Sequence, residues 1–282
     1  MTEAQATVEH WPVDASLDTA RRAELAERLI RVDSEAFGID MSPMWSRDGD
    51  ALTGLSGLFL ARLDGADIGF VAYRLWQVSG IGAILYLDAG GVSQRYRRQR
   101  VTYGMTGQAL LRALRMNEFS PMIAACRTRH PAVLEALYSR MGPDHLFPFA
   151  SSETRLRAAA IATAERLNPD QEFDQATGVI RGAYGKLGES LYDTPPRSDV
   201  KEIQDYFDAH LSEKAGDALL FTFDWDVGVL SRALYPQRSL GAWRHSGQGF
   251  VVFPWVTTDG DRPGVSVIEV AEDGTSSWAD YE

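Results

Sequence analysis

The sequence predicts a mixed α/β fold, in which helices flank a central sheet. The first observation is the order of the apolar patterns, which reads strand, helix, three strands, helix, strand, helix, strand over the first 150 residues. The second is a hairpin over residues 57–76, where Asp64 and Gly65 supply a turn between two apolar runs. The third is an arginine-rich turn that leaves the central strand and enters a helix.

Three stretches in the first half have helical periodicity. Residues 19–37 place one apolar stripe at helical spacing: Leu25, Leu29, Ile30, Val32, Ala36 and Phe37. Residues 102–118 repeat the pattern with Leu110, Leu111, Leu114 and Met116. A third helix begins at Pro131, ends at Gly142 and has an apolar face made of Val133, Leu134, Leu137, Tyr138 and Met141. Residues 42–54 read as a loop or a short broken helix.

The remaining apolar runs predict strands. Residues 83–92 and 121–127 read as short strands, and residues 145–150 are a further candidate. Beyond residue 150 we expect a helix over 153–167, an irregular packed loop over 178–196, a helix over 199–214 and a strand over 217–225. Short strand-like runs in 241–282 suggest a final hairpin.

Composition limits the classes of function. The chain has 282 residues, a net charge of −11 and a single cysteine, Cys126. The acidic charge argues against a nucleic-acid partner, and one cysteine excludes an internal disulfide or a cysteine-based zinc cluster. No apolar run approaches the length of a membrane span, and the polar N-terminus resembles no targeting signal, so we expect a cytoplasmic, soluble protein. The five histidines have no ligand spacing, and we expect no metal.

The arginine-rich turn is the strongest functional signal. Four arginines (Arg95, Arg97, Arg98 and Arg100) stand between the strand over 83–92 and the helix that follows. A helix start offers free N–H groups and a positive dipole end to an anion, and arginine adds bidentate contacts. A solvated arginine run is the alternative. On an acidic chain, a local basic patch suits a small anionic ligand better than a polymer.

These segments together resemble the GNAT superfamily of acyl-CoA-dependent N-acyltransferases. The hairpin with the Asp64-Gly65 turn is similar to that family's second and third strands, and residues 92–102 are similar to its pyrophosphate loop. Residues 131–142 resemble its late helix, in which a Leu-Tyr pair, here Leu137-Tyr138, is followed four residues later by glycine. The resemblance covers about a third of the chain.

The resemblance implies a mostly antiparallel central sheet with an added C-terminal helical/β extension. We expect a GNAT-like core over residues 1–150, a helical insertion or added layer over 151–216, and the final sheet strand with an extension over 217–282.

The resemblance also implies a donor site. Acyl-CoA would be the co-substrate, bound by the backbone of Gly91 and Val92 beside a bulge and by a loop made of Arg97, Arg98, Gln99, Arg100, Val101 and Thr102. The loop is degenerate, because Arg100 and Thr102 occupy the family's glycine positions. A second register, with Gln99 first and Gly104 last, recovers one glycine but requires two extra residues after Val92.

Two catalytic residues follow from the same resemblance. Tyr138 falls where the family often places the general acid that protonates the leaving thiolate, although a core tyrosine is the alternative. Asp88 lies four residues before Val92, and regular alternation would put both on one face, where a base acting through water would meet the acceptor ammonium. A polar residue satisfied by its neighbours is the alternative for Asp88.

Other residues give weaker signals. Cys126 lies in an apolar strand and reads as inert core, and His130 precedes the helix that carries Tyr138. The acceptor pocket has four aromatic candidates, which could equally be core: Tyr184, Tyr192, Phe207 and Trp225.

Three functions remain open. The first is an enzyme, an N-acyltransferase that moves an acetyl or related group from acyl-CoA to a small amine by direct attack in a ternary complex. The second is a GNAT-like pseudoenzyme that senses a ligand or binds a partner. The third is a GNAT-fold transferase with another donor, such as aminoacyl-tRNA. A homodimer is compatible with the sequence.

Overall fold

A computed structural model describes residues 7–13, 17–45, 52–97, 101–118, 120–150, 154–185, 195–225, 249–256, 263–270 and 276–281. Its first half contains β1 (Thr7–Trp11), α1 (Thr19–Phe37), α2 (Ser42–Trp45), β2 (Gly57–Leu63), β3 (Ala66–Val78), β4 (Gly82–Val92), α3 (Val101–Met116), β5 (Met122–Thr128), α4 (Pro131–Met141) and β6 (Leu146–Phe147). Its second half contains α5 (Thr154–Leu167), β7 (Phe173–Asp174), β8 (Val179–Ile180), α6 (Lys201–His210), β9 (Ala218–Trp225), β10 (Gly249–Val256), β11 (Pro263–Val270) and β12 (Ser276–Tyr281).

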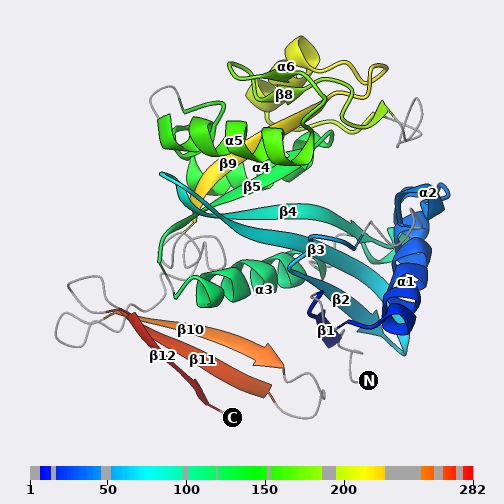
Figure 1. Cartoon of the computed structure of the whole chain (residues 1–282), viewed down its shortest axis with the longest axis vertical. Coiled ribbons are helices and arrows are strands. Elements are labelled where there is room, and N and C mark those ends of the chain that lie inside the picture. The colour runs from blue at the N-terminus through cyan, green and yellow to red at the C-terminus, as the bar shows by residue number, and fades with distance from the viewer. Residues whose placement is uncertain are drawn as a thin grey trace.

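The described strands form one large mixed sheet and one small sheet (Figure 1). The large sheet has the order β1-β2-β3-β4-β5-β9-β8-β7, and β6 pairs with β9. All its pairings are antiparallel except that of β4 with β5. The predicted fold class, a mixed and mostly antiparallel sheet flanked by helices, is therefore confirmed. The small sheet, β10-β11-β12, contains the hairpin expected near the C-terminus and one more strand.

Local chemistry explains the element boundaries. Asp18 caps α1, because its side chain accepts a hydrogen bond from the backbone N–H of Arg21 at 2.8 Å. Gly38 ends this helix in the left-handed conformation. Asp64 and Gly65 both have positive φ, as the hairpin turn between β2 and β3 requires.

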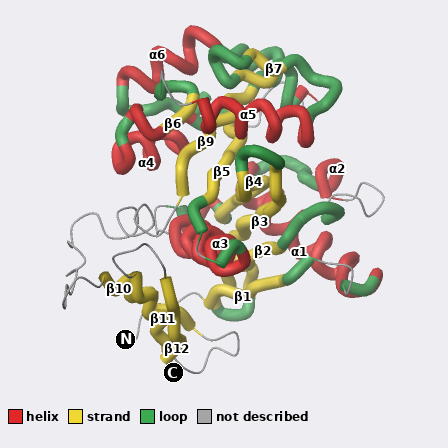
Figure 2. Tube along the Cα trace, turned by 60° about the vertical axis from the view of Figure 1, so that its left-hand side comes forward, coloured by secondary structure: helices red, strands yellow, loops and turns green. Residues whose placement is uncertain are grey.

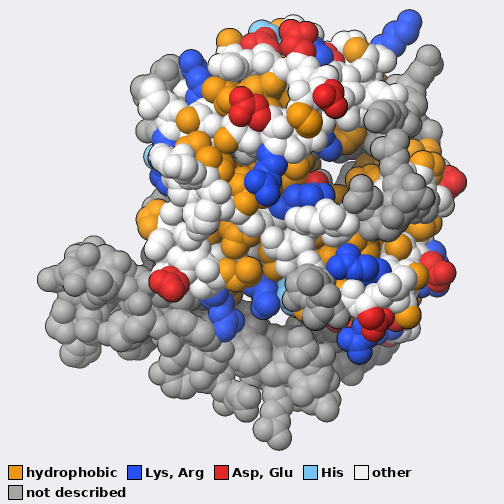
Figure 3. All heavy atoms as spheres, in the orientation of Figure 1, with side chains coloured by type: hydrophobic (Ala, Val, Ile, Leu, Met, Phe, Trp, Pro, Cys, Tyr) orange, Lys and Arg blue, Asp and Glu red, His pale blue; other side chains and the backbone are white. Residues whose placement is uncertain are grey.

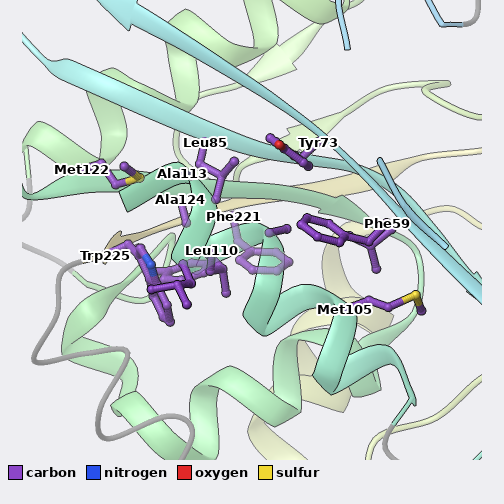
Figure 4. Packing of buried hydrophobic residues seen from close by; sticks show 14 of the residues in the cluster. Phe59, Tyr73, Leu85, Met105, Leu110, Ala113, Met122, Ala124, Phe221 and Trp225 are labelled. Atoms are coloured by element: carbon purple, nitrogen blue, oxygen red, sulfur yellow. The ribbon is translucent and has the colours of Figure 1, made fainter. Parts of the chain in front are cut away.

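The helices lie on two faces of the large sheet. Buried residues of α3, α4 and α6 pack on one face, here called the α3 face, with Phe59, Leu85 and Phe221 among the strand residues beneath them. Buried residues of α1 and α5 pack on the other, here called the α1 face. Figure 2 shows β2 and β3 between α3 and α1. Figure 4 shows the packing of Met105, Leu110 and Ala113 from α3 against the sheet.

The second half of the chain completes the sheet. β9 pairs antiparallel with β5 along its whole length, from Met122↔Trp225 to Thr128↔Leu219. The strand predicted over 217–225 is therefore confirmed as an element, and it covers the edge of β5. The division of the chain into units at residues 150 and 216 stays a prediction.

Four sequence expectations need correction. The helix expected to reach residue 214 ends at His210, where Ser212 N–H turns to the Asp217 carboxylate at 3.0 Å. The strand expected over 145–150 is only two residues long, and β8 lies inside the segment expected to be an irregular loop. Met116, expected on an apolar face, is 54% exposed.

Candidate functional site

The candidate site begins where β4 and β5 separate. Their parallel pairing runs from Ile84↔Ile123 to Leu87↔Cys126, yet β4 continues to Val92 and β5 to Thr128. Residues 88–92 of β4 therefore have no β5 partner, while residues 89–92 are paired with β3 on the other side. An unpaired strand edge beside a partner that turns away can take a ligand that offers amide groups.

A β-bulge at Asp88 causes the change in geometry. Tyr73 faces Leu87 and Ala72 faces Ala89, so Asp88 is the extra residue on β4. Before the bulge, Leu85 packs on the α3 face; after it, Val92 packs there although its number is even. We expected a bulge beside Gly91 and Val92, and the structure places it at Asp88, three residues before Gly91.

Asp88 is held by Arg74. The Arg74 guanidinium donates from Nε to Asp88 Oδ2 at 2.9 Å, and Nη2 lies 2.9 Å from the same oxygen. Ala72 and Trp76, the neighbours of Arg74 at alternate positions on β3, pack on the α1 face. Asp88 and Val92 therefore point to opposite faces of the sheet. The expectation that they share one face is wrong, because the bulge interrupts the alternation on which it was based.

Three further polar side chains, those of Tyr86, Arg127 and Tyr184, lie near Asp88. Tyr86 is fully buried among the residues packed on the α1 face, and its hydroxyl has no hydrogen-bond partner within the described parts of the chain. Burial raises the pKa of this hydroxyl well above its usual value; Arg127 opposes the rise and Asp88 adds to it. Arg127 donates from Nη1 to Asn168 Oδ1 at 2.7 Å, and its guanidinium carbon lies 4.9 Å from the centre of the Tyr184 ring. Lys and Arg side chains gather across the middle of the molecular face drawn in Figure 3.

Sequence reasoning missed Arg127 and Tyr86 and listed Tyr184 only as one of four aromatic candidates. Arg127 and Arg129 are two positions apart at the end of a buried strand, so their side chains should lie on one face of the sheet. This spacing is the signal that could have identified Arg127 from the sequence. Of the other aromatic candidates, Phe207 and Trp225 pack in the core on the α3 face, and Tyr192 lies outside the described residues. Burial raises the pKa of the Cys126 thiol to about 12, which agrees with its reading as inert.

Tyr138 lies on the other face, on α4. Its ring packs at the side of the core beneath α3, 5.3 Å from the Phe149 ring, and its hydroxyl donates a hydrogen bond to Glu202 Oε2 of α6. Burial, together with Glu202, raises the pKa of the Tyr138 hydroxyl to about 12. Asp88 and Tyr138 are thus on opposite faces of the sheet.

The arginine-rich turn contacts α1 in its described part. Arg97 donates from Nη2 to the backbone carbonyl of Ala36, in the last turn of α1, and Arg95 lies 3.4 Å from Glu35 Oε1. Arg98, Gln99 and Arg100 lie outside the described residues. Val101, half-buried, and Thr102, exposed, form the start of α3. His130 accepts a hydrogen bond at Nδ1 from the Ala132 N–H and so caps α4.

The described residues were considered for a metal site and for a membrane-spanning helix, and they contain neither. They contain no cluster of three or more histidine, cysteine or acidic side chains arranged for a metal. No described helix combines the length and the apolar character needed to cross a bilayer.

Comparison with known proteins gives similarity at the level of solved structures. No family model matches the chain, and no curated protein sequence matches it. An aminoglycoside N-acetyltransferase, AAC(6')-Iy in complex with CoA, is 15% identical, with 49% of this chain and 88% of that chain covered and a TM-score of 0.36. The ribosomal-protein-S18-alanine N-acetyltransferase from Escherichia coli is 13% identical, with 79% and 96% covered and a TM-score of 0.38. The IAA acetyltransferase from Bacillus cereus is 10% identical, with 78% and 99% covered and a TM-score of 0.38.

The fold is defined by the order of the strands, the bulge at Asp88 and the separation of β4 from β5. Four antiparallel strands lead to a parallel β4–β5 pair that separates beside a helix start, and β9 is inserted next to β5. These strands form the mixed, mostly antiparallel sheet that the sequence predicts. Within this sheet, Gly91 and Val92, the predicted donor residues, lie on the stretch of β4 that has no β5 partner, and Tyr138 lies on the α3 face.

Proposed function

We propose that the protein is an N-acyltransferase, which moves an acetyl or related acyl group from acyl-CoA to a small amine by direct attack in a ternary complex. The observation that carries the proposal is the unpaired edge of β4 over residues 88–92, beside the bulge at Asp88 and before the start of α3. Such an edge offers backbone groups of Gly91 and Val92 to the amides of a pantetheine arm.

The proposed base and the proposed acid lie on opposite faces of the large sheet. On the α1 face, Asp88 Oδ2 accepts from Arg74, and Oδ1 has no hydrogen-bond partner among the described residues. We assign to Oδ1 the proton that the acceptor ammonium loses, taken through a water molecule before the amine nitrogen attacks the acyl carbon. On the α3 face, the Tyr138 hydroxyl donates its proton to the sulfur of the leaving thiolate. As the carbon–sulfur bond breaks, the nitrogen of the new amide loses its second proton to solvent, and Tyr138 then recovers a proton from solvent.

The contacts of Tyr138 also support a second candidate, a GNAT-like protein that binds a ligand without turnover. The hydroxyl already donates to Glu202, and a phenol with a pKa near 12 is a weak acid toward a thiolate. The arginine turn supports the same candidate, because Arg97 is engaged with Ala36.

Calorimetry with CoA and acetyl-CoA tests the proposal. Micromolar affinity, followed by turnover of acetyl-CoA with a panel of primary amines, is the expected result. Asp88→Asn keeps the size of the side chain and removes its basicity, so kcat should fall while CoA affinity stays the same. Silence up to millimolar CoA overturns the proposal. Binding without turnover for any amine favours the ligand-binding candidate.

A further inference from the structure

A small cavity lies at the carboxyl end of β5, next to the site described above. Its volume is about 100 Å³, and it is lined by Arg129 after β5, by residues 195–197, by Phe207 and Leu211 of α6 and its C-terminal end, and by Asp217 before β9. The space is large enough for one small polar group.

Arg129 is the residue that gives this cavity its chemistry. Only 9% of the residue is exposed, and Nη2 donates to the backbone carbonyl of Glu213 at 2.8 Å. Its other terminal nitrogen, Nη1, is buried and has no hydrogen-bond partner in the described chain. A buried guanidinium N–H without an acceptor is costly, so a native structure that keeps one is explained when a ligand supplies the acceptor.

Three acidic residues line the cavity, Asp208, Glu213 and Asp217, and none of them is a hydrogen-bond partner of Arg129 Nη1. Asp217 Oδ2 accepts from Arg181 Nη1 at 2.8 Å and from Ser212 N–H at 3.0 Å, and its Oδ1 accepts from the Gly182 N–H at 3.0 Å. Asp208 accepts from Gln204 Nε2 at 2.9 Å. A second guanidinium, that of Arg197, is exposed and also lines the cavity.

The ring of Tyr184 lies near both Arg129, which lines the cavity, and Arg127, which belongs to the candidate site. The Arg127 guanidinium lies 4.9 Å from the centre of the Tyr184 ring, and the Arg129 guanidinium lies 5.9 Å from it. Arg127 in turn belongs to the group of side chains around Asp88. The two arginines are two positions apart along β5, which corresponds to about 7 Å.

We propose that Arg129 and Arg197 bind a carboxylate carried by the acceptor, so that the acceptor is an amine with a carboxylate about 7 Å or more from its nitrogen. The inference rests on the proposed function and names the substrate class for that site. A carboxylate fits better than a phosphate, because the cavity is small and Arg129 presents one unpaired nitrogen beside one already bonded.

Titration calorimetry with three matched ligands tests the proposal: 6-aminohexanoate, 6-aminohexanamide and inorganic phosphate. The full chain, without acyl-CoA, should bind 6-aminohexanoate at least about tenfold more tightly than the amide. Arg129→Gln should remove this preference, and Arg197→Gln should reduce it several-fold. Arg155→Gln is the control, because Arg155 forms an exposed ion pair with Asp224 on α5 and β9 and should leave the preference unchanged. A thermal melt of each variant shows whether it is folded.

The outcomes separate this inference from the proposed function. Equal binding of acid and amide by wild type, or an unchanged preference in a folded Arg129→Gln or Arg197→Gln variant, overturns the inference. Tighter binding of phosphate than of 6-aminohexanoate also overturns it, in favour of a phosphorylated ligand. Turnover of hexylamine and 6-aminohexanoate at equal kcat/KM keeps the proposed function and rejects the carboxylate site. Carboxylate binding that Arg129→Gln removes, without any acyl transfer, keeps the site and rejects the transferase.

Discussion

Asp33 of α1 carries a carboxylate that is buried in the folded chain. Only 1% of it is exposed; Oδ2 accepts from Trp45 Nε1 at 2.7 Å, and Oδ1 has no partner in the described chain. Burial raises the pKa of this carboxyl from 3.8 to about 6. The folded state therefore holds the proton more tightly than the unfolded state does.

This predicts a pH-dependent gain in stability for Asp33→Asn. The cost of the charge is absent below the unfolded pKa of 3.8 and reaches its full size, about 3 kcal/mol, as the pH rises above 6. The amide keeps an oxygen for Trp45 and carries no charge. Urea denaturation should show the variant more stable than wild type at pH 8 and nearly equal to it at pH 4. A difference that does not change between these pH values would contradict the raised pKa.

Tyr138 should affect turnover more than binding, provided that the protein is an acyltransferase. An acid that protonates the thiolate acts in the transition state, so Tyr138→Phe should lower kcat by about 10²-fold and leave donor affinity unchanged. The loss of one hydrogen bond should cost about 1 kcal/mol of stability at most. Full activity in Tyr138→Phe rejects the acid role, and a large drop in Tm identifies a structural residue.

Glu202→Gln supplies the control for Tyr138. After burial, Glu202 is the largest cause of the raised pKa of the Tyr138 hydroxyl, so the amide should bring that pKa back toward its usual value. The phenol then becomes a better acid. The alkaline limb of the kcat profile should move to lower pH in Glu202→Gln and vanish in Tyr138→Phe.

At the scale of elements, the arginine turn is attached to the end of α1. Arg97→Ala removes the hydrogen bond to the Ala36 carbonyl and should lower the free energy of unfolding by about 1 kcal/mol. Arg95→Ala is the matched control, because Arg95 makes only exposed contacts, an ion pair with Glu35 and a ring contact with Tyr96, and should change stability less than Arg97→Ala does. Urea unfolding and CoA calorimetry on both variants decide the role of Arg97. A loss of CoA affinity with unchanged stability would show that its guanidinium faces the anion.

Periodicity predicted the elements well because their apolar faces are local properties of the sequence. The pattern from Leu25 to Phe37 gave α1 at its observed bounds, and Pro131 and Gly142 marked both ends of α4. The site depends instead on contacts between distant segments. Tyr138 meets Glu202 across 64 positions, and Tyr184 reaches Arg127 across 57 positions, so neither pair leaves a trace in the local pattern. The bulge at Asp88 was misplaced for a similar reason, since it is defined by the register with β3.

At the scale of the whole molecule, β9 links the second half of the chain to the first. It covers β5 with Phe221 and Phe223, both fully buried, and it pairs with β8 on its other side. The helices α5 and α6 then cover opposite faces of the sheet (Figure 1). The residues before 150 therefore share their hydrophobic interior with residues that follow them.

A fragment that ends at Ala150 should not fold by itself. Without β9, the backbone edge of β5 from Met122 to Thr128 is unpaired, and the apolar side chains that packed against β9 face water. Expression of residues 1–150 should give insoluble protein or a fragment that melts without a cooperative transition. A soluble fragment with a sharp thermal transition would instead show two separable domains.

The bulge at Asp88 adds one residue to β4 without changing the faces of the residues on either side of it. Leu87 faces Tyr73 and Ala89 faces Ala72, so a chain without Asp88 would continue the same ladder, with Val92 still in the core beneath α3. The extra residue places a carboxylate at the point where β4 leaves β5, and Arg74 holds it there. We therefore expect a deletion of Asp88 to leave the fold and the burial of Val92 intact while it removes this carboxylate, as a substitution at this position would.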